Sequence, residues 1–304
     1  MEEYWKVLKS PYEFSLIKKQ SSFANWQSIL YMGGTKKGCV ELVVNNLDVP
    51  EAYHRFADPL VAKMPVVEYD NKCALSPGGL LHGEGTRIMV RTAIEILIQM
   101  YPHVKHLELD DASNMSCTTH LDVDESTSGQ SQSHHSVSLP HLSIFTSGMT
   151  WYEKHFRATL PEIKRHSAYR EKVSSAFQTP LNVPFEVVFH EYLVRFPNIL
   201  LLVPSYASTA SLNDMAKKGL DTLGKDKFCE TIAPWLENFV NQQLKGINVN
   251  SVWTIDLSNF TQRLSTFSLV KQNTLANSGG AKKVAKSKIQ KLRRRTNGFS
   301  MADM

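Results

Sequence analysis

Two glycines stand directly before a long amphipathic stretch, in a position where they could bind phosphate. Gly83 and Gly85 lie in the segment Leu81-His-Gly-Glu-Gly-Thr-Arg-Ile-Met, after which apolar residues recur at helical spacing as far as Tyr101. Glycine permits a tight turn and the close approach of a ligand. The first turn of a helix also presents free backbone N–H groups and the positive end of the helix dipole. The pattern indicates either a phosphate site or an ordinary helix start with turn glycines.

The spacing of these glycines excludes the two commonest nucleotide motifs. A dinucleotide-binding turn needs a third glycine where this chain has Ile88, and the Gly-Lys-Ser/Thr ending of a P-loop is absent. No Gly-x-Ser-x-Gly element occurs either, so the sequence does not indicate a hydrolase of that kind.

The elements around the turn follow a recognisable order. Residues 39–44 and 66–69 alternate or run apolar like strands, and residues 50–64 indicate a helix limited by Pro59. The amphipathic helix ends at Pro102, and residues 103–110 alternate like another strand. The order strand, glycine turn, helix and strand predicts a βαβ-like unit.

This combination resembles the GCN5-related N-acetyltransferase superfamily. Its members have a turn of the form [RQ]-x-x-G-x-[GA] before the helix that binds the CoA pyrophosphate, then a strand that often reads Leu-Glu-Val. A later helix carries a Tyr-Glu-x-x-Gly-Phe-like element. Here Leu107-Glu-Leu and Trp151-Tyr-Glu-Lys-His-Phe stand in those places, over about residues 35–160. The Thr-Trp-Tyr-Glu-Lys form is most similar to divergent acetyltransferase-like proteins of large DNA viruses.

The resemblance implies acetyl-CoA as cofactor and direct acyl transfer to an amine. Glu108 would be the general base, and Tyr152 would protonate the departing CoA thiolate. Splayed central strands would leave backbone groups free for the pantetheine arm. The pyrophosphate would be held by the backbone amides of six successive residues: Gly83, Glu84, Gly85, Thr86, Arg87 and Ile88.

Three departures leave open whether such a protein is active. Leu80 replaces the Arg or Gln of the family motif, and His155 replaces a glycine in the late element. Glu84 puts a carboxylate inside the turn, where it would repel a pyrophosphate unless it points away. Tyr152 could equally be a core aromatic residue, and Glu108 could be a solvent-facing strand residue.

The whole chain is expected to have a mixed α/β fold, with a central sheet flanked by helices. We expect a short helix and irregular chain over residues 1–34 and the acetyltransferase-like core over 35–160, interrupted by a polar insertion over 112–138. A mainly helical extension follows over 161–270, with helices in 161–177, 185–196 and 213–244 and a late strand over 251–257. Trp235, Phe239 and Trp253 are expected in the core.

The four cysteines are far apart and suggest neither disulfides nor a structural zinc site. Cys39, Cys73, Cys117 and Cys229 show no paired spacing, which predicts reduced thiols. The insertion and its flanks hold further metal-ligand types without regular spacing, so no metal site is predicted. These residues are Cys117, His120, Asp122, Asp124, His134, His135 and His141.

The C-terminal segment carries the positive charge of the chain. The net charge is +5, but residues 271–304 hold nine basic residues and one acid, so residues 1–270 carry −3. After Asn277-Ser-Gly-Gly, which reads as a hinge, the tail suits a polyanion such as nucleic acid, an anionic membrane face or an acidic protein surface, unless it only solubilises the chain. The residues expected to bind are Lys282, Lys283, Lys286, Lys288, Lys291, Arg293, Arg294 and Arg295.

Two functions of different class remain open from the sequence. The first is an acyl-CoA-dependent N-acetyltransferase-like protein, active or not, with an unidentified amine acceptor. The second is a non-catalytic, virion-associated scaffold that holds nucleic acid or another polyanion through its tail, with assembly partners in the virion. No signal peptide and no membrane-spanning stretch is recognised, so a cytoplasmic or nuclear location in a host cell, or a virion, is expected.

Overall fold

The computed structural model describes residues 2–22, 24–34, 38–53, 57–81, 83–110, 114–117, 135–202, 210–250, 252–258, 260 and 267–272. The chain forms two compact units, one of Met1–Glu108 with Asp256–Met304 and the other of Leu109–Ile255. It leaves the first unit within one strand of the main sheet and returns within another. These limits differ from the segments expected from the sequence.

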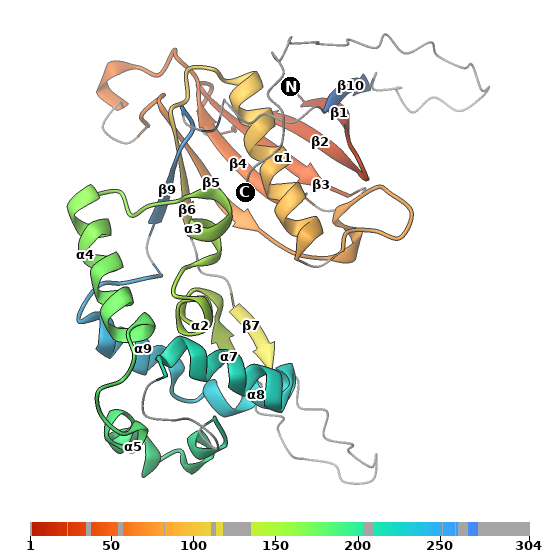
Figure 1. Cartoon of the computed structure of the whole chain (residues 1–304). Coiled ribbons are helices and arrows are strands. Elements are labelled where there is room, and N and C mark those ends of the chain that lie inside the picture. The colour runs from red at the N-terminus through yellow and green to blue at the C-terminus, as the bar shows by residue number, and fades with distance from the viewer. Residues whose placement is uncertain are drawn as a thin grey trace, which may run out of the picture. The chain divides into compact units, whose positions relative to one another are not determined.

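The main sheet, most of which belongs to the first unit, has eight strands in the order β10-β1-β2-β3-β4-β5-β6-β9 (Figure 1). Strands β1 to β5 form an antiparallel meander, and β10 pairs antiparallel with β1 at the sheet edge. The strands are β1 (Glu2–Lys9), β2 (Tyr12–Gln20), β3 (Gln27–Gly33), β4 (Gly38–Asn45), β5 (Val61–Val67), β6 (His106–Asp110), β9 (Val252–Asp256) and β10 (Ser268–Gln272).

The first three strands correct the expectation of a helix and irregular chain over residues 1–34. In β2, Tyr12, Phe14 and Leu16 are buried, while Glu13 and Ser15 between them are half-buried. This alternation has the period of a strand with one face on a core. The prediction was wrong because the number of aromatic residues does not distinguish a helix from a strand, whereas the spacing of two residues between Tyr12 and Phe14 indicates a strand.

A second correction concerns residues 50–64, where a helix was expected. Only the short 3-10 helix η1 (Glu51–Tyr53) forms there, and β5 follows with Ala62 and Met64 buried between more exposed neighbours. The strands expected over 39–44 and 251–257 are confirmed as β4 and β9, and the strand expected over 103–110 is shorter, as β6.

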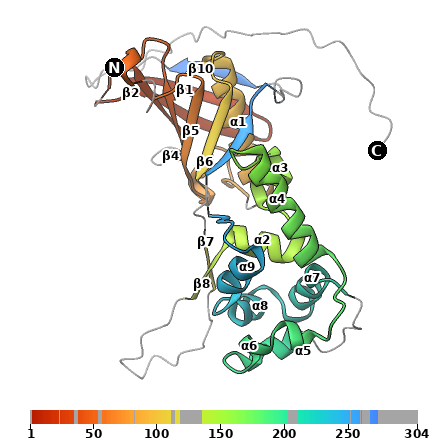
Figure 2. The same cartoon turned by 90° about the vertical axis from the view of Figure 1, so that its left-hand side faces the viewer.

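Strands β5 and β6 run parallel, with a helix between them. Leu60, directly before β5, accepts hydrogen bonds from the amides of Lys105 (2.7 Å) and His106 (3.1 Å), where β6 begins. The two strands are neighbours in the sheet and start at the same end, as Figure 2 shows. A helix that joins two parallel neighbours runs back along them, so its N-terminus lies where β5 and β6 finish.

That connecting helix is α1 (Glu84–Met100), and it confirms the amphipathic pattern. It lies against one face of the sheet (Figure 1). Its buried face is mostly apolar, with Thr92 and Glu95 as buried exceptions, and Tyr101 and Pro102 follow its last residue. The residues buried on this face include Met89, Val90, Ala93, Ile94, Ile96 and Leu97.

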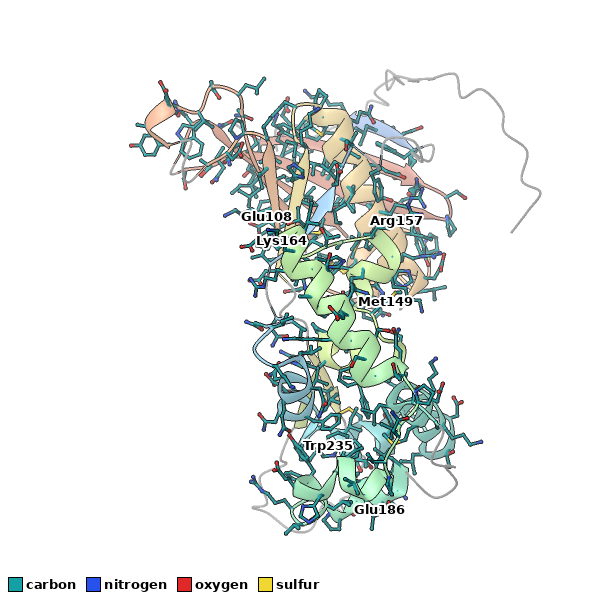
Figure 3. The ribbon with its side chains drawn as sticks, turned by 60° about the vertical axis from the view of Figure 1, so that its left-hand side comes forward. Glu108, Met149, Arg157, Lys164, Glu186 and Trp235 are labelled. Atoms are coloured by element: carbon teal, nitrogen blue, oxygen red, sulfur yellow. A yellow bond between two sulfur atoms is a disulfide. The ribbon has the colours of Figure 1, made fainter. Side chains whose placement is uncertain are left out.

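The second unit is mainly helical, as expected for the segment after residue 160. Trp235, labelled in Figure 3, is buried and makes edge-to-face contacts with Phe145, Phe189 and Phe239. Trp253 is also buried, so the three aromatic residues expected in the core are confirmed there. The helices are α2 (Leu139–Ser147), α3 (Trp151–Phe156), α4 (Ile163–Val173), the π-helix η3 (Ser174–Gln178), α5 (Phe185–Val188), α6 (His190–Leu193), η4 (Pro197–Leu202), α7 (Leu212–Leu223), α8 (Lys225–Ile232) and α9 (Leu236–Leu244).

Two short strands lie within the polar insertion expected over 112–138. Strands β7 (Asn114–Cys117) and β8 (His135–Ser138) pair antiparallel as a separate two-stranded sheet. Residues 118–134 lie outside the described residues, as does the tail from residue 273 onwards.

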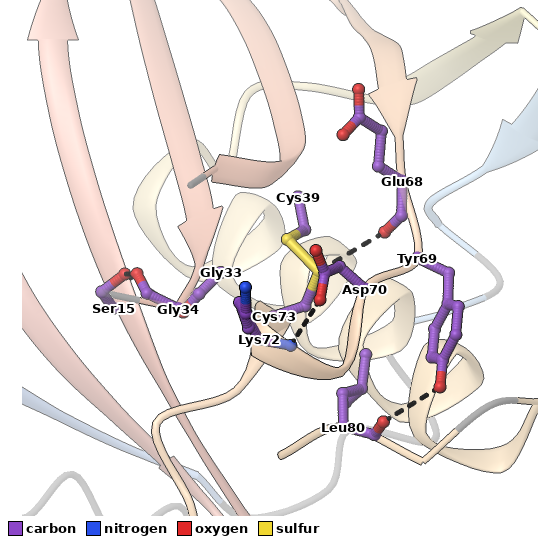
Figure 4. The surroundings of a disulfide bond; sticks show 10 residues. All are labelled: Ser15, Gly33, Gly34, Cys39, Glu68, Tyr69, Asp70, Lys72, Cys73 and Leu80. Atoms are coloured by element: carbon purple, nitrogen blue, oxygen red, sulfur yellow. Dashed lines mark hydrogen bonds between the residues drawn. A yellow bond between two sulfur atoms is a disulfide. The ribbon is translucent and has the colours of Figure 1, made fainter. Parts of the chain in front are cut away.

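All four cysteines are paired, which corrects the expectation of reduced thiols. Cys39 on β4 bonds to Cys73 of the 3-10 helix η2 (Asn71–Cys73), as Figure 4 shows, and Cys117 on β7 bonds to Cys229 on α8. The partners are 34 and 112 residues apart, so no short spacing marks them. Disulfides persist in oxidising surroundings, and the predicted cytoplasmic or nuclear location stays untested.

The mixed α/β fold class is confirmed, with an N-terminal, mostly antiparallel sheet followed by a helical region. Among the helices that the structure describes, none is long and apolar enough to cross a bilayer.

Candidate functional site

The glycine turn forms the N-terminus of α1, as the sequence indicated. Gly83 is the N-cap residue, with a φ of +75°, and no atom outside its immediate neighbours would lie within 4 Å of an added Cβ. The turn is therefore open on this side. A side chain would be strained by the backbone conformation rather than by crowding. The first amides of the helix have no intrahelical acceptor and can bind an anion.

The amide of Arg87 is not part of such a cradle. It donates to the carbonyl oxygen of Gly83 at 3.0 Å, within the first turn. Ile88 is half-buried one residue further along, and its carbonyl oxygen accepts a bond from Thr92 Oγ1 at 2.7 Å. Of the six residues expected to hold a pyrophosphate, the first four are placed to offer amides or a capping position, and the last two belong to the helix body.

Glu84 lies over the turn and contacts Arg87. Its Oε1 atom is 2.5 Å from Nη2 of Arg87, and the Glu84 side chain is 62% exposed. The carboxylate is thus turned outward into solvent and partly neutralised, and the repulsion expected for an incoming phosphate is reduced. The Arg87 guanidinium also provides a cation beside the turn, whereas Leu80 replaces the Arg or Gln of the family motif.

Leu80 and Gly85 pack against each other at the base of the turn. Leu80 is buried, and a Cβ on Gly85 would lie 3.1 Å from the Leu80 side chain and from the Tyr12 hydroxyl. A Cβ on Gly85 would push Leu80 or Tyr12 away by a few tenths of an ångström, while the positive φ of Gly83 favours glycine whatever the space. Thr86 Oγ1 is buried without a hydrogen-bond partner among the described residues.

Glu108 and Tyr152, the expected base and acid, belong to different units. Glu108 is half-buried in the middle of β6, in the first unit with the glycine turn. Tyr152 is on α3 in the second unit, and only 6% of it is exposed. Its ring centroid is 5.1 Å from that of Trp151 and 6.4 Å from that of Phe156. This environment is that of a packed aromatic residue.

Beside Tyr152, a polar network that the sequence analysis did not recognise joins α3 to α4. Glu153 forms a capping box with Thr150, with bonds of 2.8 and 3.3 Å, and its Oε2 atom accepts the Tyr169 hydroxyl at 2.8 Å. Arg170 Nη1 lies 3.5 Å from the other carboxylate oxygen. Burial, together with the Glu153 charge, raises the pKa of Tyr169 far above its usual value. The signal for this network was Thr-x-x-Glu before an aromatic run.

A second polar network surrounds His141 at the start of α2. His141 Nδ1 lies 2.6 Å from Ser138 Oγ, and Nε2 lies 3.1 Å from Asn241 Oδ1. Ser138 is the N-cap residue of α2, but its side chain makes no capping bond. His141 is buried, which lowers the pKa of its ring. These contacts connect α2 with α9.

A shallow hollow of about 400 Å³ lies on the second unit, between α5–α6 and α9. None of the residues expected at the CoA or acyl-transfer site lines it. Its walls are Val187, Val188, His190, Glu191, Tyr192, Gln242 and Gln243.

The comparisons with known proteins assign no family. No family model, curated protein or solved structure matches this chain.

The remaining candidate ligands fall into two groups. Cys117 is in a disulfide, His135 is the first residue of β8 and His141 is hydrogen-bonded, while His120, Asp122, Asp124 and His134 lie outside the described residues. Within the part of the chain that the structure describes, no group of three or more His, Cys, Asp or Glu residues could hold a metal ion. The basic residues from Lys282 to Arg295 also lie outside the described residues.

Proposed function

We propose that this chain is an N-acetyltransferase-like protein that binds an acyl-CoA at the N-terminus of α1. One observation carries the proposal: Gly83, at positive φ, opens a 17-residue helix between two parallel neighbouring strands. An exposed turn at that end of a sheet is where open α/β proteins bind phosphate-bearing ligands.

The order of elements supports the same proposal. The helix after the turn leads into β6, which carries Leu107-Glu-Leu, and a later helix, α3, carries Tyr152-Glu153. These are the elements that the resemblance to N-acetyltransferases requires. In that role the early amides of α1 hold the CoA phosphates, and Arg87 adds a positive charge beside them.

In the catalytic form of the proposal, the amine nitrogen attacks the thioester carbonyl carbon, and the carbon–sulfur bond breaks. Glu108 takes the proton that the amine loses, and Tyr152 donates one to the departing thiolate, so an amide and a CoA thiol result. Because Tyr152 is buried among aromatic rings, it can do this only if its hydroxyl reaches the thiolate.

That burial favours the second candidate, a scaffold without catalysis. Tyr152 has a sufficient structural explanation in its contacts with Trp151 and Phe156. In this case the fold is kept as a support, and the basic tail holds nucleic acid or another polyanion, in a virion or in the host cytoplasm or nucleus.

The two candidates are separated by titration calorimetry with acetyl-CoA, using the wild-type chain and Gly83→Ala. A Cβ at Gly83 strains the open turn, so we expect binding to weaken about tenfold. Gly224→Ala is the matched control, because Gly224 is also a helix N-cap with a φ of +72° and open space, but lies in the second unit. The control should bind as the wild type does.

Turnover is tested separately with a primary amine, using wild type, Tyr152→Phe and Glu108→Gln. Acetyl transfer by wild type that is lost in Tyr152→Phe supports the enzyme. Binding of acetyl-CoA with no acetyl transfer by wild type or by either variant supports the scaffold. No saturable binding of acetyl-CoA by the wild type rules out the CoA site.

The tail is tested in the full chain with its eight basic residues from Lys282 to Arg295 replaced by glutamine. If the tail binds a polyanion, wild type binds heparin or DNA with an affinity that falls steeply with salt, and the variant does not.

A further inference from the structure

The Cys39–Cys73 disulfide joins the main sheet to the segment that leads into the glycine turn. Cys39 is on β4 and Cys73 is in η2, with their Cα atoms 5.8 Å apart, and both residues are completely buried. Residues 68–81 between β5 and α1 form no strand, and η2 is their only helical element. Apart from the backbone, the disulfide is the one covalent link between this described segment and the sheet.

η2 is packed tightly against the end of β3. A Cβ added to Gly34, directly after β3, would collide with the carbonyl oxygen of Lys72. Asp70, the N-cap residue of η2, accepts the Lys72 amide at 2.8 Å on its side chain (Figure 4) and the Cys73 amide at 2.9 Å on its carbonyl. The position of η2 is therefore closely defined where the disulfide holds it.

η2 in turn fixes the residue that ends the segment. The carbonyl oxygen of Asn71 accepts the amide of Leu80 at 2.7 Å, and a Cβ on Gly79 would collide with the same oxygen. Tyr69 closes the segment from the other side, because its hydroxyl donates to the carbonyl oxygen of Leu80 at 3.3 Å (Figure 4).

Leu80 then reaches the first turn of α1. Its side chain packs on Gly85, where an added Cβ would lie 3.1 Å from it, and Gly83 lies between them in the chain. A continuous set of contacts runs from the disulfide through Asn71 and Leu80 to Gly85, all within the first unit. Because these residues are closely packed, a shift of η2 is expected to displace the turn as well.

We propose that the thiol–disulfide state of Cys39 and Cys73 controls ligand binding at the Gly83 turn. With the disulfide formed, the turn is held ready for the CoA phosphates, and after its reduction the segment 68–81 loosens and affinity falls. The inference rests on the proposed function, since it concerns the regulation of the same site.

The chemical step is thiol–disulfide exchange with a dithiol. The dithiol supplies two electrons and two protons, the Sγ–Sγ bond breaks, and two cysteine thiols and the oxidised donor result. Because both cysteines are buried, exchange requires local opening of the segment, which a donor protein or a mild rise in temperature can provide.

The test compares the full-length wild type with Cys39→Ser/Cys73→Ser and with Cys117→Ser/Cys229→Ser. The second double variant is the matched control, because it removes the disulfide of the other unit. Acetyl-CoA is the probe, since its blocked thiol cannot attack a disulfide. Wild type is also measured after treatment with a water-soluble phosphine, with reduction of each pair verified by mass spectrometry.

We expect loss of the Cys39–Cys73 bond to weaken acetyl-CoA binding about tenfold, and the control to bind as wild type does. Hydrogen exchange provides a readout that does not depend on the ligand. Amides of residues 75–87 should exchange about tenfold faster without this bond, while amides of β2 and β3 stay protected, which shows that the sheet is still folded.

The outcomes separate the two proposals. If wild type binds acetyl-CoA and the Cys39→Ser/Cys73→Ser variant binds equally well, the redox inference is overturned. If wild type binds no acetyl-CoA, the proposed function fails, and unchanged exchange at 75–87 in the variant would then overturn the structural coupling as well.

Discussion

Lys9 Nζ lies 2.7 Å from Oε2 of Glu95, whose side chain is completely buried between α1 and the sheet. The other carboxylate oxygen accepts Arg91 Nε at 3.1 Å, one turn earlier on α1. This carboxylate therefore connects strand β1 with the helix that begins at the glycine turn. A buried charge is stable only when paired in this way.

Removal of the Glu95 charge should destabilise the first unit. Glu95→Gln keeps the shape but leaves Lys9 poorly paired, and we expect a loss of about 3 kcal/mol in the free energy of unfolding. Glu84→Gln, in an exposed pair, should cost less than about 1 kcal/mol. Urea unfolding followed by hydrogen exchange of β1 and α1 amides measures both. Equal effects of the two substitutions would contradict this assignment.

The second unit should lose stability as the pH falls below about 6.5, because of His141. Burial lowers the pKa of this ring below the ordinary value of 6.5. The unfolded chain then binds the proton more readily than the folded one, so stability is complete above pH 6.5 and declines as pH falls toward the folded-state pKa. His166, whose pKa burial also lowers, acts in the same direction.

Thermal unfolding between pH 5 and 8 measures this dependence. His141→Asn should flatten the profile while lowering stability at pH 7. A profile with the same slope in His141→Asn would refute the role of this ring.

The buried Tyr169 hydroxyl should contribute more to the free energy of unfolding than an exposed tyrosine hydroxyl does. Tyr169→Phe removes the donor to the Glu153 carboxylate at 2.8 Å, and we expect a cost of about 2 kcal/mol. Tyr192→Phe removes an exposed bond to Gln242 at 3.0 Å and should cost about 0.5 kcal/mol. Exchange of α3 and α4 amides reports the first change, and similar values for both variants would argue against the buried network.

The Glu84–Arg87 pair should tune the affinity for acetyl-CoA, if the turn binds its phosphates. Glu84→Gln removes a negative charge and frees the guanidinium, so binding should tighten about threefold at low salt and less at high salt. Arg87→Gln should weaken it. Calorimetry at two salt concentrations measures both, with Glu51→Gln in η1 as an exposed acidic control. No change in either variant would place the phosphates elsewhere.

Much of the fold could be predicted where the apolar residues recur with one clear period. The helix α1 follows from the spacing of residues such as Met89, Ala93 and Leu97, and Pro102 marks its end. The N-terminal strands were missed although Tyr12, Phe14 and Leu16 alternate, because aromatic residues suit both helices and strands. The disulfides could not be predicted, since pairing depends on which distant segments the fold brings together.

The candidate site was predictable only in its local part. Gly83 was recognised because the signals for a helix start and for a glycine turn lie in consecutive residues of the sequence. The burial of Tyr152 depends on tertiary packing, and the Glu84–Arg87 contact depends on the direction of both side chains. Neither can be read from the spacing of residues in the sequence.

The pairing of β10 with β1 sets a geometric limit on the basic segment that follows. Gln272 is paired with Tyr4, and Lys271 Nζ contacts Glu3 Oε1 at 2.9 Å, so the chain departs from a fixed point at the sheet edge. At no more than about 3.5 Å per residue, Lys282 stays within roughly 35 Å of that point and Arg295 within roughly 80 Å. If these residues bind a polyanion, the point of contact lies within this radius, and the local concentration of the bound stretch around the first unit rises accordingly.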